Sequence, residues 1–177
     1  MRGKHIIKVR NRRIQFTLEI ERNITIIRGD SATGKTTLID LLRDYEAQGN
    51  QSGVTLETDK PCHVLTSIDW EENIGAFEER DGDCIFFVDE GNRFVSSQQF
   101  AQAIQKTKSY YVLITRESLH QLPYSVEAVL ELRKTTSKSR CTYNKAYPYY
   151  KTLYHATDQL GNVDRILSVD SNAGYQM

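Results

Sequence analysis

Alternating apolar and polar residues predict two short strands at the start of the chain. The runs 5–10 and 13–20 are strand candidates, with Ile14, Phe16, Leu18 and Ile20 at every second position of the latter, and Asn11 and Arg12 between the runs suit a turn. We therefore expect an antiparallel hairpin. The next run, 24–29, is largely apolar without alternation, which indicates a strand buried on both faces of a parallel sheet.

A helical period follows this third strand directly. Leu38, Leu41, Leu42 and Tyr45 recur at the spacing i, i+3, i+4 and i+7, which predicts an amphipathic helix that begins near Lys35. The small and polar residues 47–53 end this pattern.

Strand and helix patterns then alternate as far as residue 115. We expect strands at 54–58, 62–66, 84–90 and 110–115, one helix at 69–80 opened by Asp69, and one opened by Ser96 that carries Phe100. From Val126 the chain has only short β-rich runs, at 126–134, 139–146, 151–157 and 163–169.

These patterns predict one domain over 1–177, with a core at 1–125 and a β-rich extension at 126–177. Alternating strands and helices favour a three-layer α/β fold of the P-loop type, with a mainly parallel central sheet and the hairpin on one edge.

Composition narrows the classes of partner and compartment. The 23 Lys and Arg residues balance the 23 Asp and Glu residues, so no global charge attracts the protein to nucleic acid or to anionic lipid. The three cysteines, Cys62, Cys84 and Cys141, fit reduced thiols better than a disulfide framework, and the first two lie in apolar runs typical of a core. No apolar run is long enough to cross a bilayer, so we expect a cytoplasmic protein without a membrane partner.

The loop between the third strand and the first helix carries the clearest chemistry. Its sequence GDSATGKT matches G-x-x-x-x-G-K-[ST], with a buried strand before it and an amphipathic helix after it. Glycines let backbone N–H groups surround a polyphosphate, and the helix N-terminus adds its positive dipole end. Lys35 is expected to reach the β- and γ-phosphates, and the Thr36 hydroxyl to bind Mg²⁺. The expected nucleotide-binding residues are Gly29, Asp30, Ser31, Ala32, Thr33, Gly34, Lys35, Thr36 and Thr37.

Two later strand ends supply acidic and polar groups. Asp89 follows the apolar run 85–88 and is expected to hold Mg²⁺, while Glu90 can orient and polarise an attacking water. Thr115 and Arg116 follow the strand at 110–115, where Thr115 could sense the γ-phosphate and Arg116 could stabilise the transition state. Asp89–Gly91 could instead be a solvated turn, and Arg116 a surface ion-pair partner.

These residues resemble the P-loop NTPase superfamily, in the branch that has an extra strand between its two Walker motifs and a glutamate beside the second. GDSATGKT matches Walker A, IFFVDE matches Walker B, and Thr115 falls at the polar sensor position. The N-terminal half is similar to the start of ABC-type ATPase domains, but it has neither the LSGGQ signature nor room for the helical subdomain. The resemblance implies adenine as the base.

The favoured function is an Mg²⁺-dependent ATPase that converts ATP to ADP and phosphate, coupled to an unknown protein partner or to self-association. Turnover is expected to be slow without the partner, because a missing charge in trans costs about 10³ to 10⁵ in rate. The first alternative is a nucleotide-held switch that hydrolyses ATP negligibly. A small-molecule kinase is less favoured, because residues 46–75 contain no arginine for a lid.

A nucleic-acid-associated ATPase is a further alternative, based on residues 133–155. This segment interleaves lysines and arginines with five tyrosines, a pattern that can contact phosphates and stack on bases. Tyrosines also alternate well in strands, and lysines protect sheet edges, so we favour an exposed β-hairpin over a nucleic-acid surface.

Overall fold

The structure, a computed structural model, describes residues 3–28, 33–66, 68, 70–135 and 141–149, and the backbone of two short strands near the C-terminus. The described α-helices are α1 (Lys35–Gln48), α2 (Trp70–Asp81) and α3 (Gln98–Gln105). The strands are β1 (His5–Arg10), β2 (Ile14–Ile20), β3 (Ile24–Arg28), β4 (Thr55–Glu57), β5 (Cys62–Leu65), β6 (Ile85–Val88), β7 (Tyr110–Ile114), β8 (Val129–Thr135), β9 (Thr142–Pro148), β10 (Ser168–Val169) and β11 (Gly174–Tyr175).

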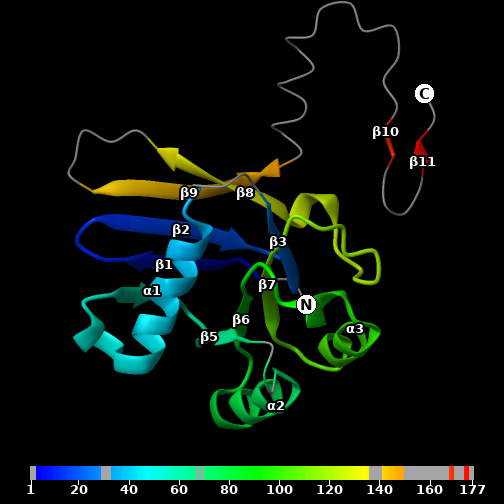
Figure 1. The fold of residues 1–177 in the computed structure, drawn as a ribbon, viewed down its shortest axis with the longest axis horizontal. Coiled ribbons are helices and arrows are strands. Elements are labelled where there is room, and N and C mark those ends of the chain that lie inside the picture. The colour runs from blue at the N-terminus through cyan, green and yellow to red at the C-terminus, as the bar shows by residue number, and fades with distance from the viewer. Residues whose placement is uncertain are drawn as a thin grey trace, which may run out of the picture.

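Nine of these strands form one mixed sheet that curls into a half-barrel (Figure 1). Their order is β4-β1-β2-β9-β8-β3-β7-β6-β5. The pairs from β8 through β3, β7 and β6 to β5 are all parallel, whereas β1 is antiparallel to both β2 and β4. β9 joins the two parts of the sheet, because it pairs parallel with β2 and antiparallel with β8. β10 and β11 pair separately and antiparallel.

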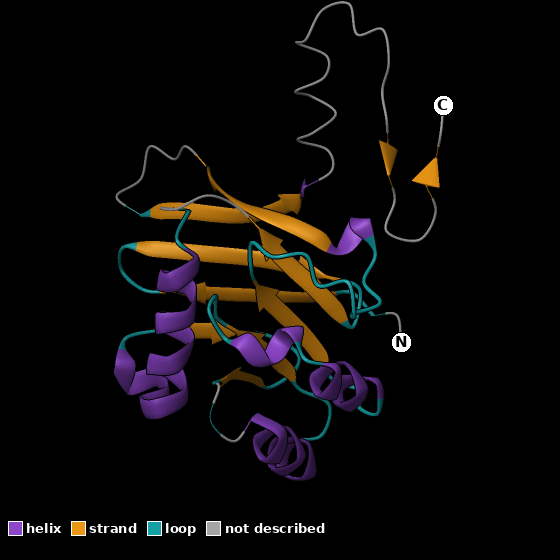
Figure 2. Ribbon diagram, turned by 45° about the vertical axis from the view of Figure 1, so that its right-hand side comes forward, coloured by secondary structure: helices purple, strands orange, loops and turns teal. Residues whose placement is uncertain are grey.

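The helices divide between the two faces of the sheet (Figure 2). Leu38, Ile39, Leu41 and Leu42 of α1 pack against β1, β2 and one face of the parallel strands. Side chains of α2 and α3 cover the opposite face of the same parallel strands. β3, β6 and β7 are therefore buried on both faces, while β1 alternates buried and exposed positions.

The expected three-layer α/β fold with a mainly parallel sheet was wrong. The main sheet is mixed, and the described chain has three α-helices beside the nine strands of that sheet. The hairpin does form, but it does not lie at an edge, since β4 covers β1 and β9 extends the sheet beyond β2. Nor are β8 and β9 peripheral, because they occupy the middle of the sheet. Periodicity predicts which face of a strand is buried, but it does not identify the neighbouring strand.

The elements as far as β7 agree closely with the expected ranges. β8 begins at Val129 rather than at 126, because 126–128 form a 3₁₀ turn, and β9 ends at Pro148 rather than at 146. One cap differs: the side chain of Ser97, not Ser96, accepts the N–H of Phe100 and begins α3, while Ser96 ends a short 3₁₀ turn. Three expected features lie outside the described residues: the α2 cap at Asp69, the strand at 151–157, and positions 163–167 of the strand expected at 163–169. None of the helices in the described ranges has the length and apolar character needed to span a bilayer.

Candidate functional site

The last two residues of the phosphate-loop motif, Lys35 and Thr36, are the first two residues of α1. Gly34 is the N-cap with φ 91°, and its carbonyl accepts the Leu38 N–H at 2.9 Å, which starts the helix at Lys35. A Cβ at Gly34 would meet the Phe16 ring at 3.2 Å. Positive φ and this close contact both favour glycine at this position. The motif residues Gly29, Asp30, Ser31 and Ala32 lie outside the described residues.

The first turn of α1 presents three motif side chains. Lys35 is buried, with 7% of its surface exposed, whereas Thr36 and Thr37 are exposed. Because its N-cap is glycine, the helix receives no side-chain oxygen from that residue for its first N–H groups. Those N–H groups and the positive dipole end together favour an anion.

Two neighbouring strands end at the same edge of the sheet as β3. Ile27 of β3 is in register with Ile114 of β7, and Leu113 of β7 with Val88 of β6. The Thr115 N–H also donates to the Ile27 carbonyl at 3.3 Å. Parallel pairing therefore places Arg28 at the end of β3, Asp89 and Thr115 at one edge. We call Lys35, Asp89, Glu90, Thr115 and Arg116 the strand-end site.

Asp89 and Glu90 form a defined turn after β6. The Asp89 carboxylate accepts the Glu90 N–H at 2.8 Å, and the Asn92 side-chain amide donates to the Asp89 carbonyl at 2.8 Å. Gly91 continues the turn with φ 91°. One Asp89 oxygen is therefore occupied by the backbone, and the turn holds the carboxylate next to the strand end.

Glu90 and Arg116 are brought together by the structure. Glu90 Oε1 lies 2.9 Å from Arg116 Nε, and both side chains are exposed. An exposed ion pair of this kind contributes about 0–1 kcal/mol, so a more highly charged ligand can compete for either partner. The expected base and the expected transition-state cation are thus partners of each other.

The buried Thr115 side chain stabilises the turn after β7. Its hydroxyl oxygen accepts the Glu117 N–H at 3.0 Å. The guanidinium of Arg28, the last residue of β3, donates to the Glu117 carbonyl at 3.3 Å and lies 3.4 Å from the Ser118 hydroxyl. Arg28, which precedes the phosphate loop, therefore restrains the turn after β7. The Thr115 hydroxyl accepts one hydrogen bond in this turn and can still donate its own proton to another acceptor.

The sequence analysis did not identify Asn144 of β9 as a site residue. Asn144 is 2% exposed, and neither amide atom has a hydrogen-bond partner in the described structure. It is in register with Phe16, and its Nδ2 lies 3.9 Å from where a Gly34 Cβ would stand. A signal was present in the alternation of residues 142–148, where Asn144 occupies an inward position that normally carries an apolar residue.

The basic, tyrosine-rich segment 133–155 includes the end of β8 and all of β9. Arg133 lies 3.2 Å from Glu131 Oε2 and 5.7 Å from the Tyr147 ring centroid, and Lys145 Nζ is also 5.7 Å from that centroid. β8 and β9 form an antiparallel pair here. Residues 136–140 and 150–155 of the segment lie outside the described residues. Nucleic-acid binding by the segment stays a hypothesis.

Comparisons with protein families and with curated proteins found no significant match.

Proposed function

We propose that the protein binds ATP·Mg²⁺ at the strand-end site and hydrolyses it to ADP and phosphate. Two observations carry this proposal: Gly34-Lys35-Thr36 starts the 14-residue helix that follows β3 in the chain, and β3 ends beside the strands that lead into Asp89, Glu90 and Thr115. A strand-to-helix turn needs no lysine and threonine after its glycine, whereas a triphosphate with its metal ion needs both.

Each residue has a separate task in this proposal. The loop backbone and the α1 N-terminus bind the phosphates, Lys35 neutralises the β- and γ-phosphates, and Thr36 and Asp89 hold Mg²⁺. Glu90 orients a water that attacks the γ-phosphorus. The new P–O bond forms as the bond to the β-phosphate oxygen breaks, and Glu90 accepts the proton of the attacking water.

The Glu90–Arg116 ion pair gives the reaction a control point. At 2.9 Å, Arg116 occupies the carboxylate that must accept a proton. A bound triphosphate attracts Arg116 more strongly than one carboxylate does, which would release Glu90 towards the water and bring positive charge to the γ-phosphate. Hydrolysis would then require nucleotide binding first.

Asn144 fits the same site as a polar contact. A buried amide without partners costs about 1–3 kcal/mol for each unsatisfied group, so its presence needs an explanation. It lies beside Gly34, where the phosphate loop joins α1. We include it as a residue that donates from Nδ2 to a phosphate oxygen when nucleotide is bound.

The ion pair between Glu90 and Arg116 also supports an alternative function, a nucleotide-held switch. If Arg116 keeps its ion pair with Glu90 in the nucleotide complex, the protein would hold ATP or ADP without turnover and act as a nucleotide-held switch. An unknown protein partner, or a second copy of the chain, could then supply the missing step. Base specificity for adenine follows only from the resemblance to P-loop NTPases.

The decisive experiment measures phosphate release from the purified chain with Mg²⁺ and each nucleoside triphosphate, with and without single-stranded DNA. Lys35→Ala should abolish nucleotide binding, and unchanged affinity would refute the proposed site. Glu90→Gln should retain binding and stop turnover, whereas full activity in this variant would exclude Glu90 as the base. Binding without turnover in the wild-type chain would favour the switch.

A further inference from the structure

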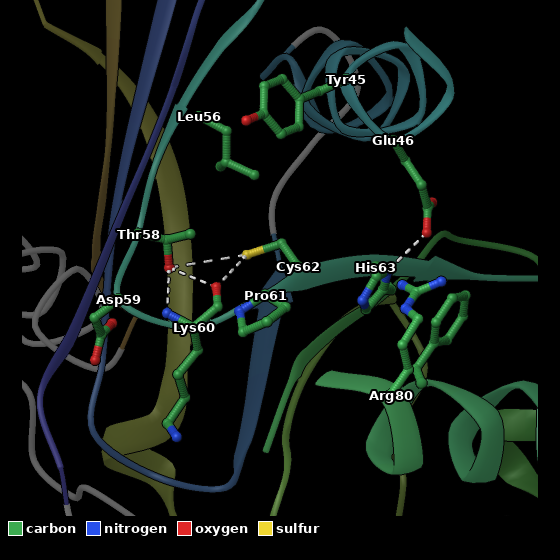
Figure 3. A pocket seen from close by; sticks show the side chains of 11 residues that line it. Tyr45, Glu46, Leu56, Thr58, Asp59, Lys60, Pro61, Cys62, His63 and Arg80 are labelled. Carbon is green, nitrogen blue, oxygen red and sulfur yellow. Dashed lines mark hydrogen bonds and ion pairs between the residues drawn. The ribbon is translucent and has the colours of Figure 1, made fainter. Parts of the chain in front are cut away.

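A second cluster of reactive side chains lies at the opposite edge of the parallel strands. His63 on β5 is buried, and its Nδ1 is 2.7 Å from Glu46 Oε1 of α1, as Figure 3 shows. Its Nε2 is 3.0 Å from Asp81 Oδ2 at the end of α2. The Phe77 ring stacks on the imidazole with centroids 3.9 Å apart. The imidazole is therefore held in one plane, with a carboxylate at each nitrogen.

Cys84 completes this cluster from the start of β6. It is fully buried, and its Sγ and the nearest ligand atoms of His63 and Asp81 all lie within 4.8 Å of one another. The backbone of Cys84 is fixed on both sides, since its N–H donates to the Ser109 hydroxyl and its carbonyl accepts the Tyr110 N–H. The thiol is oriented towards the Gly82 carbonyl at 3.2 Å.

We propose that His63 Nε2, Asp81 and Cys84 bind one zinc ion, with a fourth position for water and with Glu46 as the outer partner of His63. Imidazole, thiolate and carboxylate together suit Zn²⁺, whereas Mg²⁺ and Ca²⁺ prefer oxygen ligands alone. Zinc bonds of about 2.0–2.3 Å place tetrahedral ligand atoms about 3.5 Å apart. The observed spread requires the side chains to close by about 1 Å.

The Glu46 contact prepares His63 for a metal ion. A ligating histidine usually donates its other ring N–H to a carboxylate, which fixes the tautomer and raises the basicity of the free nitrogen. Glu46 makes this contact at Nδ1, so Nε2 is the nitrogen directed to Asp81. Arg80 contacts both Asp81 oxygens, with Nε 2.9 Å from Oδ1 and Nη2 2.6 Å from Oδ2. Zinc would therefore replace the Nη2 contact at Oδ2, while the Nε contact at Oδ1 can remain.

Zinc binding takes the proton of the Cys84 thiol, which lies 3.2 Å from the Gly82 carbonyl oxygen. Binding forms Zn–N, Zn–S and Zn–O bonds and breaks the S–H bond of Cys84, and the thiol proton goes to the solvent.

An open cavity adjoins this cluster at His63. It has a volume of about 730 Å³, and its lining includes Glu46, Cys62, His63 and Arg80 but neither Asp81 nor Cys84 (Figure 3). The proposed zinc site is separate from the strand-end site, since Cys84 precedes β6 and Asp89 follows it. A failure of nucleotide binding would therefore leave the zinc proposal standing, and the reverse also holds.

The test is a Co²⁺ titration of the full chain after chelator treatment, without nucleotide. We expect a thiolate-to-cobalt charge-transfer band that saturates at one ion per chain and disappears when Zn²⁺ is added, because zinc displaces cobalt from tetrahedral sulfur-containing sites. Cys84→Ser should abolish the band. Cys62→Ser is the matched control and should keep it. Absence of the band from the wild-type chain, or its retention in Cys84→Ser, would overturn the proposal.

Two further measurements test the zinc site even if Cys84→Ser does not fold. Glu46→Gln should still bind Zn²⁺, but about 10- to 100-fold more weakly, as expected for an outer partner. Indicator dye in weakly buffered solution should record the Cys84 thiol proton released as Zn²⁺ binds the wild-type chain. Release of no protons would show that the ion binds elsewhere and that His63 only links the two carboxylates.

Discussion

The substitution Asn144→Leu should stabilise the nucleotide-free protein while it weakens nucleotide binding. Asn144 is buried with both amide atoms unpartnered in the described structure, next to the N-cap of α1. Leucine has the same branched shape with somewhat larger volume, and it carries no polar group. The change therefore removes the cost of desolvating the amide, and it also removes the proposed hydrogen bond to a phosphate oxygen.

The two effects have separate magnitudes. Two unsatisfied atoms at about 1–3 kcal/mol each make a gross gain of about 2–6 kcal/mol, from which overpacking by the larger side chain takes about 1–3 kcal/mol. We expect a net increase of about 2 kcal/mol in the free energy of unfolding, or about 4–8 °C in Tm for a chain of this length. A hydrogen bond to a charged group contributes about 1.5–3 kcal/mol, so the Kd for ATP should rise about 10- to 150-fold.

Urea unfolding followed by circular dichroism gives the first quantity, and equilibrium titration with ATP·Mg²⁺ gives the second. Tyr143→Leu is the control, because Tyr143 is an exposed neighbour on β9 and its replacement should change neither quantity by more than about 0.5 kcal/mol. A destabilised Asn144→Leu would mean that the amide has partners in the folded chain. A stabilised variant with unchanged Kd would show that Asn144 does not contact the nucleotide.

Four other substitutions test the proposed activity and the stability of the fold. Arg116→Ala should lower kcat by about 100-fold with little change in ATP affinity, measured by phosphate release; an unchanged or raised kcat would mean that Arg116 only restrains Glu90. Gly34→Ala should lower the free energy of unfolding by about 1–3 kcal/mol, because φ is 91° and the Phe16 ring is close, whereas Gly75→Ala, in the open interior of α2, should raise it by up to about 1 kcal/mol. Burial raises the pKa of the Cys62 thiol from 9.0 to about 12, so this thiol ionises at lower pH in the unfolded chain than in the folded one. The free energy of unfolding should therefore fall as pH rises between these two values. In Cys62→Ala the urea midpoint should depend less on pH across this range, and an unchanged dependence would assign the loss of stability to other groups.

Local elements could be predicted from the sequence because their causes are local. The alternation in 13–20, the i, i+3, i+4 spacing after Lys35 and the apolar run before Asp89 each predicted an element within one or two residues of its observed bounds. The cap of α3 was misplaced by one residue, since Ser96 and Ser97 are adjacent and either hydroxyl could begin the helix. The common edge of β3, β6 and β7 followed from the expected parallel pairing.

Contacts between distant segments could not be predicted in the same way. The pattern of β9 shows one buried face, but it does not show that the strand lies between β2 and β8. Asn144 becomes notable only when Gly34 is found beside it, and Cys84 only when His63 and Asp81 converge on it. In each case the partners come from separate elements, and their meeting depends on strand order, which residue periodicity does not contain.

The central position of β9 has a consequence for synthesis of the chain. The β1–β2 hairpin and the parallel strands can form as soon as their residues have left the ribosome, but they remain two separate sheets until residue 148 is available to join them. During that interval the outer edges of β2 and β8 lack their shared neighbour, and open strand edges of this kind promote aggregation. Ribosome-stalled chains that end before Thr142 should therefore require a chaperone, while chains stalled far beyond Pro148 should resist proteolysis.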